Sequence, residues 1–529
     1  MTLSMGRAAA AALLCWWCCA LVADGARVLM LLPTSARSQK APFLALGAAL
    51  TGRGHRVVFF SAFRPSVPVP GVEEVVPERL AQQFAEENFP NMFRINSEGV
   101  QAGWRQYRAL LADGPRAALN SSELHHLLRQ RFDVVILGIF GYPFYFVPHA
   151  LNAPFILLSP VSYVPFLTSP LGSPTLPALN PSIPFTAGTD RMSFTQRVKN
   201  VIGTVWMDTL IRTVYATYSD RLVAEEFGDG VMPRALDIER NASLVLLNSN
   251  PVMDYHKPLL PNVIEVGGLH CTAPNELPAE VAAFLGDSEF VLFSLGSVVR
   301  PQDMSPEQKA AILAALGSLP YKVLLKWDTT NRTGLPVNIL PSKWLPQQDI
   351  LGSSKCRLFI SHGGFASVVE SVCHGVPMVV LPVSSDQQCN AARAARLGIA
   401  EVLTWDALST ETLGAAVATA LSGGPRAAVL HRQRLLREQP VPPLQLAVHW
   451  VEHVIRHGGA PHLRSVGAEL SFFQYYSLDV LAFLLAVLLL ALKLLVVVVR
   501  WMIRCCCGWI WTHNSGGVNV GQDNKDKDD

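Results

Sequence analysis

The sequence predicts an α/β protein with two doubly wound parallel-sheet domains and one membrane-spanning helix near its C-terminus. Short apolar runs that suit buried strands alternate with helix-like segments in two series, separated by a proline-rich stretch at 250–262. Such alternation favours parallel sheets covered by helices. A longer apolar run, at 480–499, is interrupted only by Lys493 and suits the membrane-spanning helix. With 529 residues the chain is too long for one ordinary core, so two large domains are expected.

The N-terminus has the features of a secretory signal peptide. Arg7 supplies a positive charge, residues 8–19 are apolar, and Ala23 and Gly25 are small residues suited to cleavage. We therefore expect residues 1–25 to be the signal. The alternative, a hydrophobic first strand or helix, is not needed because residues 27–32 already supply a buried strand.

The first domain is expected at 26–249. Its long Pro- and Ser-rich stretch at 159–184 predicts a loop or lid. The remaining elements are a helix at 43–51 and continuous apolar strands at 27–32, 57–61, 134–137, 155–159 and 243–248.

The second domain is expected at 263–450, after a linker at 250–262 that contains three prolines. Its predicted strands are 291–294, 322–327, 358–361 and 379–381, with helices at 306–316, 365–374 and 387–397. Ligands of such sheets bind at the carboxyl ends of strands, so the cleft between the domains is the expected site.

The C-terminal part is predicted to be a membrane anchor. We expect a return helix and membrane-proximal segment at 451–478, a transmembrane helix at 479–500 and a cytosolic tail at 501–529. Aromatic residues flank the span, and Arg500 and Arg504 follow it, which predicts a type I protein with a lumenal body. A buried core helix is the alternative. The final Lys-Asp-Lys-Asp-Asp resembles a dilysine retrieval signal for the endoplasmic reticulum, although a merely solvated tail has the same composition.

Charge and cysteine usage narrow the function further. The formal net charge is only +2, and no basic run is interleaved with aromatics, so nucleic acid is not an expected partner. The spacing of the four cysteines in the body predicts neither a zinc site nor a disulfide scaffold. These cysteines are Cys271, Cys356, Cys373 and Cys389. Three sequons, at Asn120, Asn241 and Asn331, are candidate glycosylation sites of a lumenal body.

The most informative stretch runs from Trp344 to Asn390. A predicted strand ends in His362-Gly363-Gly364, and a helix follows; glycines let the backbone approach a ligand, and the free amides of the helix start favour a phosphate. Ser367 lies in the first turn, and Glu370 could accept hydrogen bonds from ribose hydroxyls. Downstream, Asp386-Gln387 opens another helix and offers both an acceptor and a donor to a sugar ring. His-Gly-Gly alone is also compatible with an ordinary strand-to-helix turn.

As a whole, this stretch resembles the signature of the UDP-glycosyltransferase family, in the membrane-anchored animal form typified by UDP-glucuronosyltransferases. The resemblance extends to Val266–His270 and Tyr476–Asp479 and so covers nearly the whole chain. It implies a GT-B fold, with two Rossmann-like domains facing across a cleft, and inverting transfer from a UDP-sugar to a small lipophilic acceptor. No cofactor or metal is implied, and homo- or hetero-oligomers with related transferases are compatible with it.

The resemblance also assigns roles within the donor site. It implies that Trp344 stacks on uracil and that Gln347 and Glu370 bind ribose. One departure is Ala366, where an amide residue is usual. The UDP-sugar-binding set is completed by the diphosphate contacts Ser297, His362, Gly364 and Ser367, the sugar contacts Asp386 and Gln387, and the adjoining Leu345 and Gly363.

The catalytic pair of the family is missing. By alignment on Arg53-Gly54-His55 and on Phe132-Asp133, the positions of the family's histidine base and its aspartate partner are occupied by Gln39 and Gly138. Gln39 cannot accept a proton at neutral pH, and Gly138 has no side chain. The residues nearest in sequence that could replace this pair are His149 and Asp133. His149 follows a proline and is expected in a helix, and Asp133 lies at the wrong end of its strand.

Two functions follow from an intact donor site beside an empty base position. The first is a weak or atypical transferase that favours acceptors needing little deprotonation. The alternative is a catalytically inactive UDP-sugar-binding protein or partner subunit. The aromatic residues Phe140, Tyr142, Phe144, Tyr145 and Phe146 either line a lipophilic acceptor pocket or belong to the ordinary core.

Overall fold

The structure is a computed structural model that describes residues 25–65, 67–85, 90–94, 109–181, 189–384 and 386–514. The described chain forms two units, which divide between Ala468 and Glu469. Nearly all of the expected signal peptide, and the end of the expected tail from 515 onward, lie outside the described residues.

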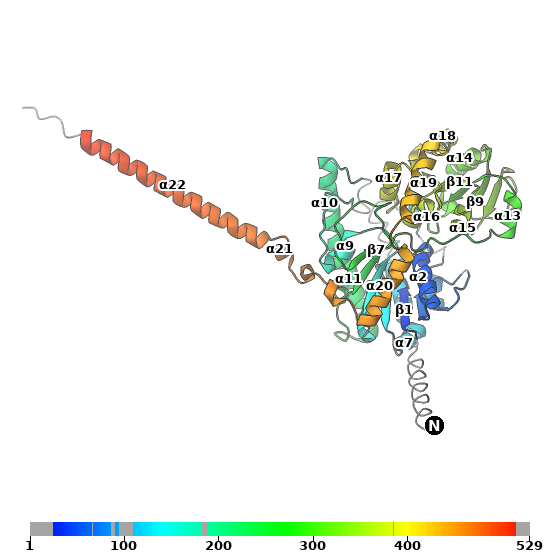
Figure 1. Cartoon of the computed structure of the whole chain (residues 1–529), viewed down its shortest axis with the longest axis horizontal. Coiled ribbons are helices and arrows are strands. Elements are labelled where there is room, and N and C mark those ends of the chain that lie inside the picture. Colours follow the sequence, from blue (N-terminus) through cyan, green and yellow to red (C-terminus); the bar gives the residue numbers. More distant parts are fainter. Residues whose placement is uncertain are drawn as a thin grey trace, which may run out of the picture. The chain divides into compact units, whose positions relative to one another are not determined.

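The first sheet of the larger unit has seven parallel strands in the order β3-β2-β1-β4-β5-β6-β7 (Figure 1). Strands β1 and β4, near the centre of the sheet, are buried along almost their whole length because helices cover both faces of the sheet. The strands are β1 (Arg27–Leu32), β2 (Arg56–Ser61), β3 (Val72–Val75), β4 (Val134–Gly138), β5 (Phe155–Ser159), β6 (Leu244–Leu247) and β7 (Val263–Glu265). The helices are α2 (Lys40–Gly52), α3 (Glu78–Gln83), α6 (Gly114–Leu119), α7 (Ser122–Leu127), α8 (Phe146–Ala150), α9 (Pro165–Thr168), α10 (Phe194–Thr209), α11 (Ala216–Phe227) and α12 (Ala235–Glu239).

The second sheet has six parallel strands in the order β10-β9-β8-β11-β12-β13. They are β8 (Phe290–Ser294), β9 (Lys322–Lys326), β10 (Ile339–Ser342), β11 (Cys356–Ser361), β12 (Met378–Val380) and β13 (Ala400–Val402). The helices are α13 (Ala279–Leu285), α14 (Pro306–Gly317), α15 (Gln347–Leu351), α16 (Phe365–His374), α17 (Gln387–Arg396), α18 (Thr410–Ala420) and α19 (Gly423–Arg437). Two parallel sheets confirm the predicted architecture.

The domain boundary differs from the expected one in two places. Strand β7, which the sequence analysis placed in the second domain, pairs with β6 of the first sheet. The expected return helix begins earlier than residue 451: α20 (Pro443–His457) packs on the first domain, where Val451 and Val454 contact the apolar cluster that contains Leu46 and Leu50 of α2 (Figure 1). The chain therefore crosses to the second domain only after β7, and α20 covers apolar surface on α2 that would otherwise face water.

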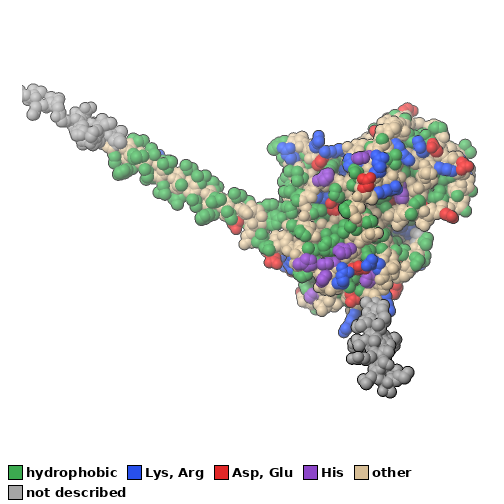
Figure 2. All heavy atoms as spheres, in the orientation of Figure 1, with side chains coloured by type: hydrophobic (Ala, Val, Ile, Leu, Met, Phe, Trp, Pro, Cys, Tyr) green, Lys and Arg blue, Asp and Glu red, His purple; other side chains and the backbone are tan. Residues whose placement is uncertain are grey.

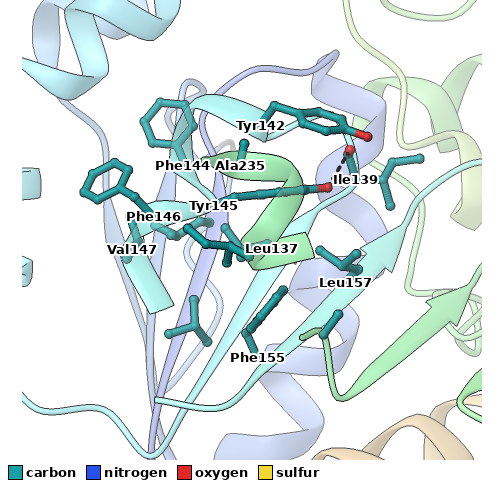
Figure 3. Close-up of a cluster of buried hydrophobic side chains, with 14 of the residues drawn as sticks. Leu137, Ile139, Tyr142, Phe144, Tyr145, Phe146, Val147, Phe155, Leu157 and Ala235 are labelled. Carbon is teal, nitrogen blue, oxygen red and sulfur yellow. Dashed lines mark hydrogen bonds between the residues drawn. The ribbon is translucent and has the colours of Figure 1, made fainter. Parts of the chain in front are cut away.

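The aromatic run after β4 is mostly core rather than pocket lining. Tyr142, Phe144, Tyr145 and Phe146 are at most 2% exposed and pack together, and the Tyr145 hydroxyl donates to the carbonyl oxygen of Ile139 at 3.0 Å (Figure 3). Of the five aromatics of this run, only Phe140 lines the large cavity described below.

A disulfide joins Cys271 to Cys373, with Cα atoms 6.3 Å apart. The cysteine spacing did not reveal this bond, because the two partners are 102 residues apart in sequence. One follows β7 and the other lies near the end of α16, and only the packing of the second domain brings them together. Cys356 and Cys389 are buried free thiols.

The smaller unit consists of α21 (Phe472–Tyr475) and the long helix α22 (Leu478–Asn514). Within its segment Leu478–Cys505, an 18-residue stretch has a mean hydropathy of 3.1 and is not buried by other described parts of the protein. Hydrophobic side chains cover the described part of this helix (Figure 2). It is a candidate membrane span, and the helix continues well beyond the expected end at residue 500.

Candidate functional site

A cavity of about 860 Å³ lies between the two sheets and is lined by segments that follow their strands. The loop after β1 contributes residues 34–41, and the segment after β10 contributes residues 344–349. Of the site residues assigned from the family resemblance, only Gly363 and Gly138 do not line it. Those that do are Gln39, Ser297, Trp344, Leu345, Gln347, His362, Gly364, Ser367, Glu370, Asp386 and Gln387.

The start of α16 is built around His362. Gly363 has a φ of +79°, a conformation that favours glycine, and Gly364 is the N-cap of the helix. The imidazole fits between two glycines, since a Cβ on Gly296 or Gly364 would lie 2.5 or 2.6 Å from its ring atoms. Burial, with a contribution from Lys326, lowers the pKa of His362 to about 4. The ring is therefore neutral at physiological pH and offers a hydrogen bond rather than a charge.

Next to the helix start, one serine has an unused hydroxyl. The Ser297 Oγ atom is buried and has no hydrogen-bond partner within the described part of the chain. Buried hydroxyls are normally satisfied, so an unsatisfied one on the wall of a cavity points to a ligand that supplies its partner.

A second cluster surrounds Glu370, one turn into α16. The Gln347 amide nitrogen, at the start of α15, donates to Glu370 Oε2 at 2.8 Å and to Ser367 Oγ at 3.2 Å. Burial raises the pKa of Glu370 to about 7, against a lowering contribution from the Gln347 hydrogen bond. His270 Nε2 lies 3.9 Å from Glu370 Oε1, and burial lowers the pKa of His270 to about 4. The sequence motif did not identify His270 as a neighbour of this carboxyl group.

The third cluster is at the start of α17. The Gln387 amide oxygen accepts hydrogen bonds from the backbone of Val383 at 2.8 Å and Ser384 at 3.2 Å, so the carbonyl end of this side chain shapes the loop. Asn390 Nδ2 donates to Asp386 Oδ2 at 2.8 Å and to the Gly363 carbonyl at 3.0 Å. Burial raises the pKa of Asp386. Asn390 thus ties the expected sugar-binding loop to the expected phosphate-binding loop.

A buried ionic network extends from this cluster to the first domain. Arg393 Nη2 donates to Asn390 Oδ1 at 2.9 Å, and Arg393 Nη1 pairs with Asp254, which also accepts a hydrogen bond from Ser162 after β5. Lys257 Nζ lies 3.3 Å from Asp254. Burial alone would raise the pKa of Asp254, but Arg393 and Lys257 outweigh it and hold the pKa below its usual range. Sequence reasoning missed this network because the paired residues lie 139 positions apart.

Trp344 faces the cavity with 46% of its surface exposed. Two cations approach its ring: the Arg37 guanidinium carbon lies 5.2 Å from the ring centroid, and Lys326 Nζ lies 5.7 Å from it. Arg37 belongs to the first domain and Lys326 to the second, so both domains contribute charge beside this ring.

Gln39 and Gly138, the residues expected at the positions of the family's base and its partner, lie close to each other. Both line a small void of about 10 Å³ beside the main cavity. A Cβ on Gly138 would lie 2.7 Å from Cδ1 of Leu32. The nearest substitutes lie elsewhere: His149 is exposed on α8, and Asp133 accepts the backbone N–H of Arg27 at 2.7 Å near the opposite end of β4. Neither lines the cavity.

The three sequon asparagines, Asn120, Asn241 and Asn331, are all exposed. Their glycosylation stays a prediction. Within the ranges that the structure describes, no group of three or more His, Cys, Asp or Glu residues is arranged to hold a metal ion.

Known proteins are similar to this chain in sequence and in fold. Residues 46–510 match the family model of UDP-glucoronosyl and UDP-glucosyl transferases. The chain is 37% identical to UDP-glucuronosyltransferase 1A5 of Homo sapiens over 70% of its own length and 69% of that protein. It is 32% identical to UDP-glucosyltransferase 2 of Dactylopius coccus over 88% of its own length and 90% of that protein.

Solved structures share the fold at low sequence identity. The crystal structure of TcCGT1 in complex with UDP matches 82% of this chain and all of its own chain, with a TM-score of 0.55 and 15% identity. This confirms the predicted GT-B architecture. With a family model that matches most of its length and relatives above 30% identity, the chain belongs to the UDP-glucuronosyl and UDP-glucosyl transferase family.

Proposed function

We propose that this protein transfers a hexose or glucuronate from a UDP-sugar to a small lipophilic acceptor. The observation that carries the proposal is the convergence of His362, Ser367, Glu370 and Asp386 on one cavity beside the start of α16. The helix start and the unsatisfied Ser297 hydroxyl suit a diphosphate, and the carboxyl group of Glu370 suits ribose hydroxyls. The UDP complex of TcCGT1 and the names of the relatives support a UDP-sugar donor.

The other half of the cavity supports a lipophilic acceptor. Apolar side chains make up most of its wall in the first domain, and the polar groups of this wall come mainly from the loop after β1. Such a surface binds small molecules chiefly by burial of apolar area. The apolar lining residues include Leu44, Phe84, Met92, Phe140, Val161, Met207, Leu210 and Ile211.

The absent base bears on which acceptors react. In inverting transfer the acceptor attacks the anomeric carbon while the bond from that carbon to UDP breaks, and an alcohol must also lose a proton. With Gln39 at the base position, no side chain there can take that proton. A carboxylate or an acidic phenol that is already ionised needs no base, so such acceptors should react best.

The same observation favours a second candidate, a UDP-sugar-binding protein or partner subunit without useful activity. Membranes containing the full chain, incubated with UDP-glucose, UDP-galactose or UDP-glucuronate and a broad acceptor panel, separate the two. We expect product above that of a His362→Ala variant. Absence of product from any acceptor, with UDP binding retained, would leave only the binding role.

The site is proposed to face the lumen of the endoplasmic reticulum, with the protein anchored as a single-pass type I membrane protein by α22. The Cys271–Cys373 disulfide supports this placement, because such bonds persist in oxidising compartments. The expected signal peptide, the exposed sequons and the apolar α22 are compatible with it.

The pKa of Glu370 gives a pH prediction for nucleoside binding. Its pKa lies near 7, above the ordinary value of 4.5, so the group is mostly protonated at pH 6 and ionised at pH 8. The carboxylate can accept a hydrogen bond on each oxygen from the two ribose hydroxyls, whereas the protonated acid keeps one oxygen as a donor and accepts more weakly. The affinity for uridine, which has no phosphate to titrate, should therefore fall roughly tenfold between about pH 8 and about pH 6.

Calorimetry on the wild type and a Glu370→Gln variant measures this effect. The pKa values of His362 and His270, near 4, keep both rings neutral throughout this range, so they should not contribute. The glutamine variant should bind uridine with little dependence on pH. An equal pH dependence in both proteins would show that Glu370 does not bind the ribose.

A further inference from the structure

Arg37 is a cation of the first domain that lies in the donor half of the cavity. It begins the 3-10 turn Arg37–Gln39 after β1 and is partly buried. Its guanidinium carbon lies 5.2 Å from the ring centroid of Trp344, a residue of the second domain. The side chain therefore reaches across the cleft to the ring on which the uracil is expected to stack.

Among the residues that the structure describes, the Arg37 side chain has no anionic partner, unlike two neighbouring cations. Throughout the described ranges its side chain forms no hydrogen bond or ion pair, and its guanidinium group lies against the aromatic rings of Trp344 and Phe63. By contrast, Arg64, which lines the same cavity, pairs with Glu78, and Lys40 pairs with Glu74. A partly buried guanidinium without a counter-ion suggests that an anionic ligand supplies one.

The position of Lys326 indicates which anion the Arg37 side chain binds. Its Nζ atom lies 5.7 Å from the Trp344 ring centroid and donates to the carbonyl of Gly296, the residue that packs against the ring of His362. Lys326 thus marks the phosphate-binding side of Trp344. Two positive charges from opposite domains beside one ring repel each other, and an anion bound between or beside them would offset this repulsion.

We propose that Arg37 binds the diphosphate of the UDP-sugar from the first domain and stabilises UDP as it leaves. This inference rests on the proposed function. When the bond from the anomeric carbon to UDP breaks, its electron pair stays on the β-phosphate oxygen, where negative charge increases. A cation fixed at that place lowers the barrier, and electrostatic stabilisation of this kind is usually the largest catalytic contribution. A guanidinium cannot act as the missing base, because it stays protonated.

Such a contact would explain how the site works without its histidine. For an ionised acceptor no proton needs to be removed, and departure of UDP becomes the step that the protein must assist. The reaction rate then depends on how well the protein stabilises the leaving UDP rather than on how well it activates the acceptor. Arg37 lies two residues before Gln39, which occupies the expected base position.

Isothermal calorimetry with UDP and uridine on the full chain in detergent tests the proposal. An Arg37→Met variant should bind UDP roughly tenfold more weakly than the wild type, since a charge-assisted contact to phosphate is lost from a solvent-accessible cleft. Its affinity for uridine should be unchanged. The matched control, Arg64→Met, removes a cavity-lining arginine that already has a carboxylate partner and should bind both ligands normally.

Three results would overturn the inference while leaving the proposed function intact. These are unchanged UDP affinity in Arg37→Met, equal losses for UDP and uridine, and an equal loss of UDP affinity in the Arg64→Met control. If the wild type binds no UDP, the proposed function itself fails. If Arg37→Met does not fold, Arg37→Lys serves as the second variant, because it keeps the charge. We expect it to retain most of the UDP affinity. A tenfold loss of UDP affinity in a folded lysine variant would contradict a role that depends chiefly on charge.

Discussion

A variant with the base and its partner restored should turn over alcohol acceptors roughly 10²–10⁴ times faster than the wild type. The change combines Gln39→His, Gly138→Asp and Leu32→Val. Gln39 and Gly138 line one small void, so a histidine and an aspartate at these positions should meet and form a base with its orienting carboxylate. Rates with a lipophilic alcohol and with a carboxylic acid of similar shape, measured for the wild type and the variant, give the result.

The third substitution is needed because Gly138 is packed against Leu32. A Cβ at position 138 would lie 2.7 Å from Cδ1 of Leu32, at the end of a flexible side chain, and valine lacks that atom. We therefore expect the variant without Leu32→Val to gain less. The rate with the carboxylic acid should change little, because this acceptor needs no base. No gain on the alcohol in a folded triple variant would show that the two positions are not those of the family's catalytic pair.

The second large effect is expected at the buried network between the domains. Replacing Arg393 by methionine should lower the free energy of unfolding by about 3 kcal/mol. Asp254 then stays buried and keeps only one of the two cations that offset its charge, Lys257. Arg393 also holds Asn390, so the affinity for UDP-sugar should fall even in the folded fraction. Urea unfolding followed by tryptophan fluorescence, together with calorimetry, measures both effects.

Arg396→Met on the same helix is the matched control. Arg396 pairs with Asp190, and both side chains are about one-third exposed, so its loss should cost at most about 1 kcal/mol. Similar losses of stability in the two variants would contradict the special role of the buried pair. Loss of stability at Arg393 with unchanged UDP-sugar affinity would confine its role to structure.

The parts of the protein that could be predicted from sequence are those whose signal is local. Continuous apolar runs identified strands such as β1 and β4. The motif from Trp344 to Asn390 supplied most of the candidate donor-site residues that line the cavity, because these residues lie close together along the chain. The assignment of Gln39 and Gly138 to the positions of the family's catalytic pair also used short distances to recognisable motifs, and it stays a prediction.

The remaining features depend on contacts between distant segments. Cys271 and Cys373 meet only after α16 has packed on its sheet, and the Asp254–Arg393 pair forms only when the two domains come together. Likewise, β7 is a three-residue strand with a weak pattern of its own, and it joins the first sheet through its pairing with β6. No spacing rule predicts such contacts, because loops and whole domains separate the partners.

A structure of the full chain with UDP bound tests the central claim most directly. The account predicts uracil against the ring of Trp344, ribose hydroxyls at Glu370 and Gln347, and the diphosphate at the first turn of α16. UDP bound outside the cavity, or bound with Trp344 and Glu370 directed away from it, would contradict the account.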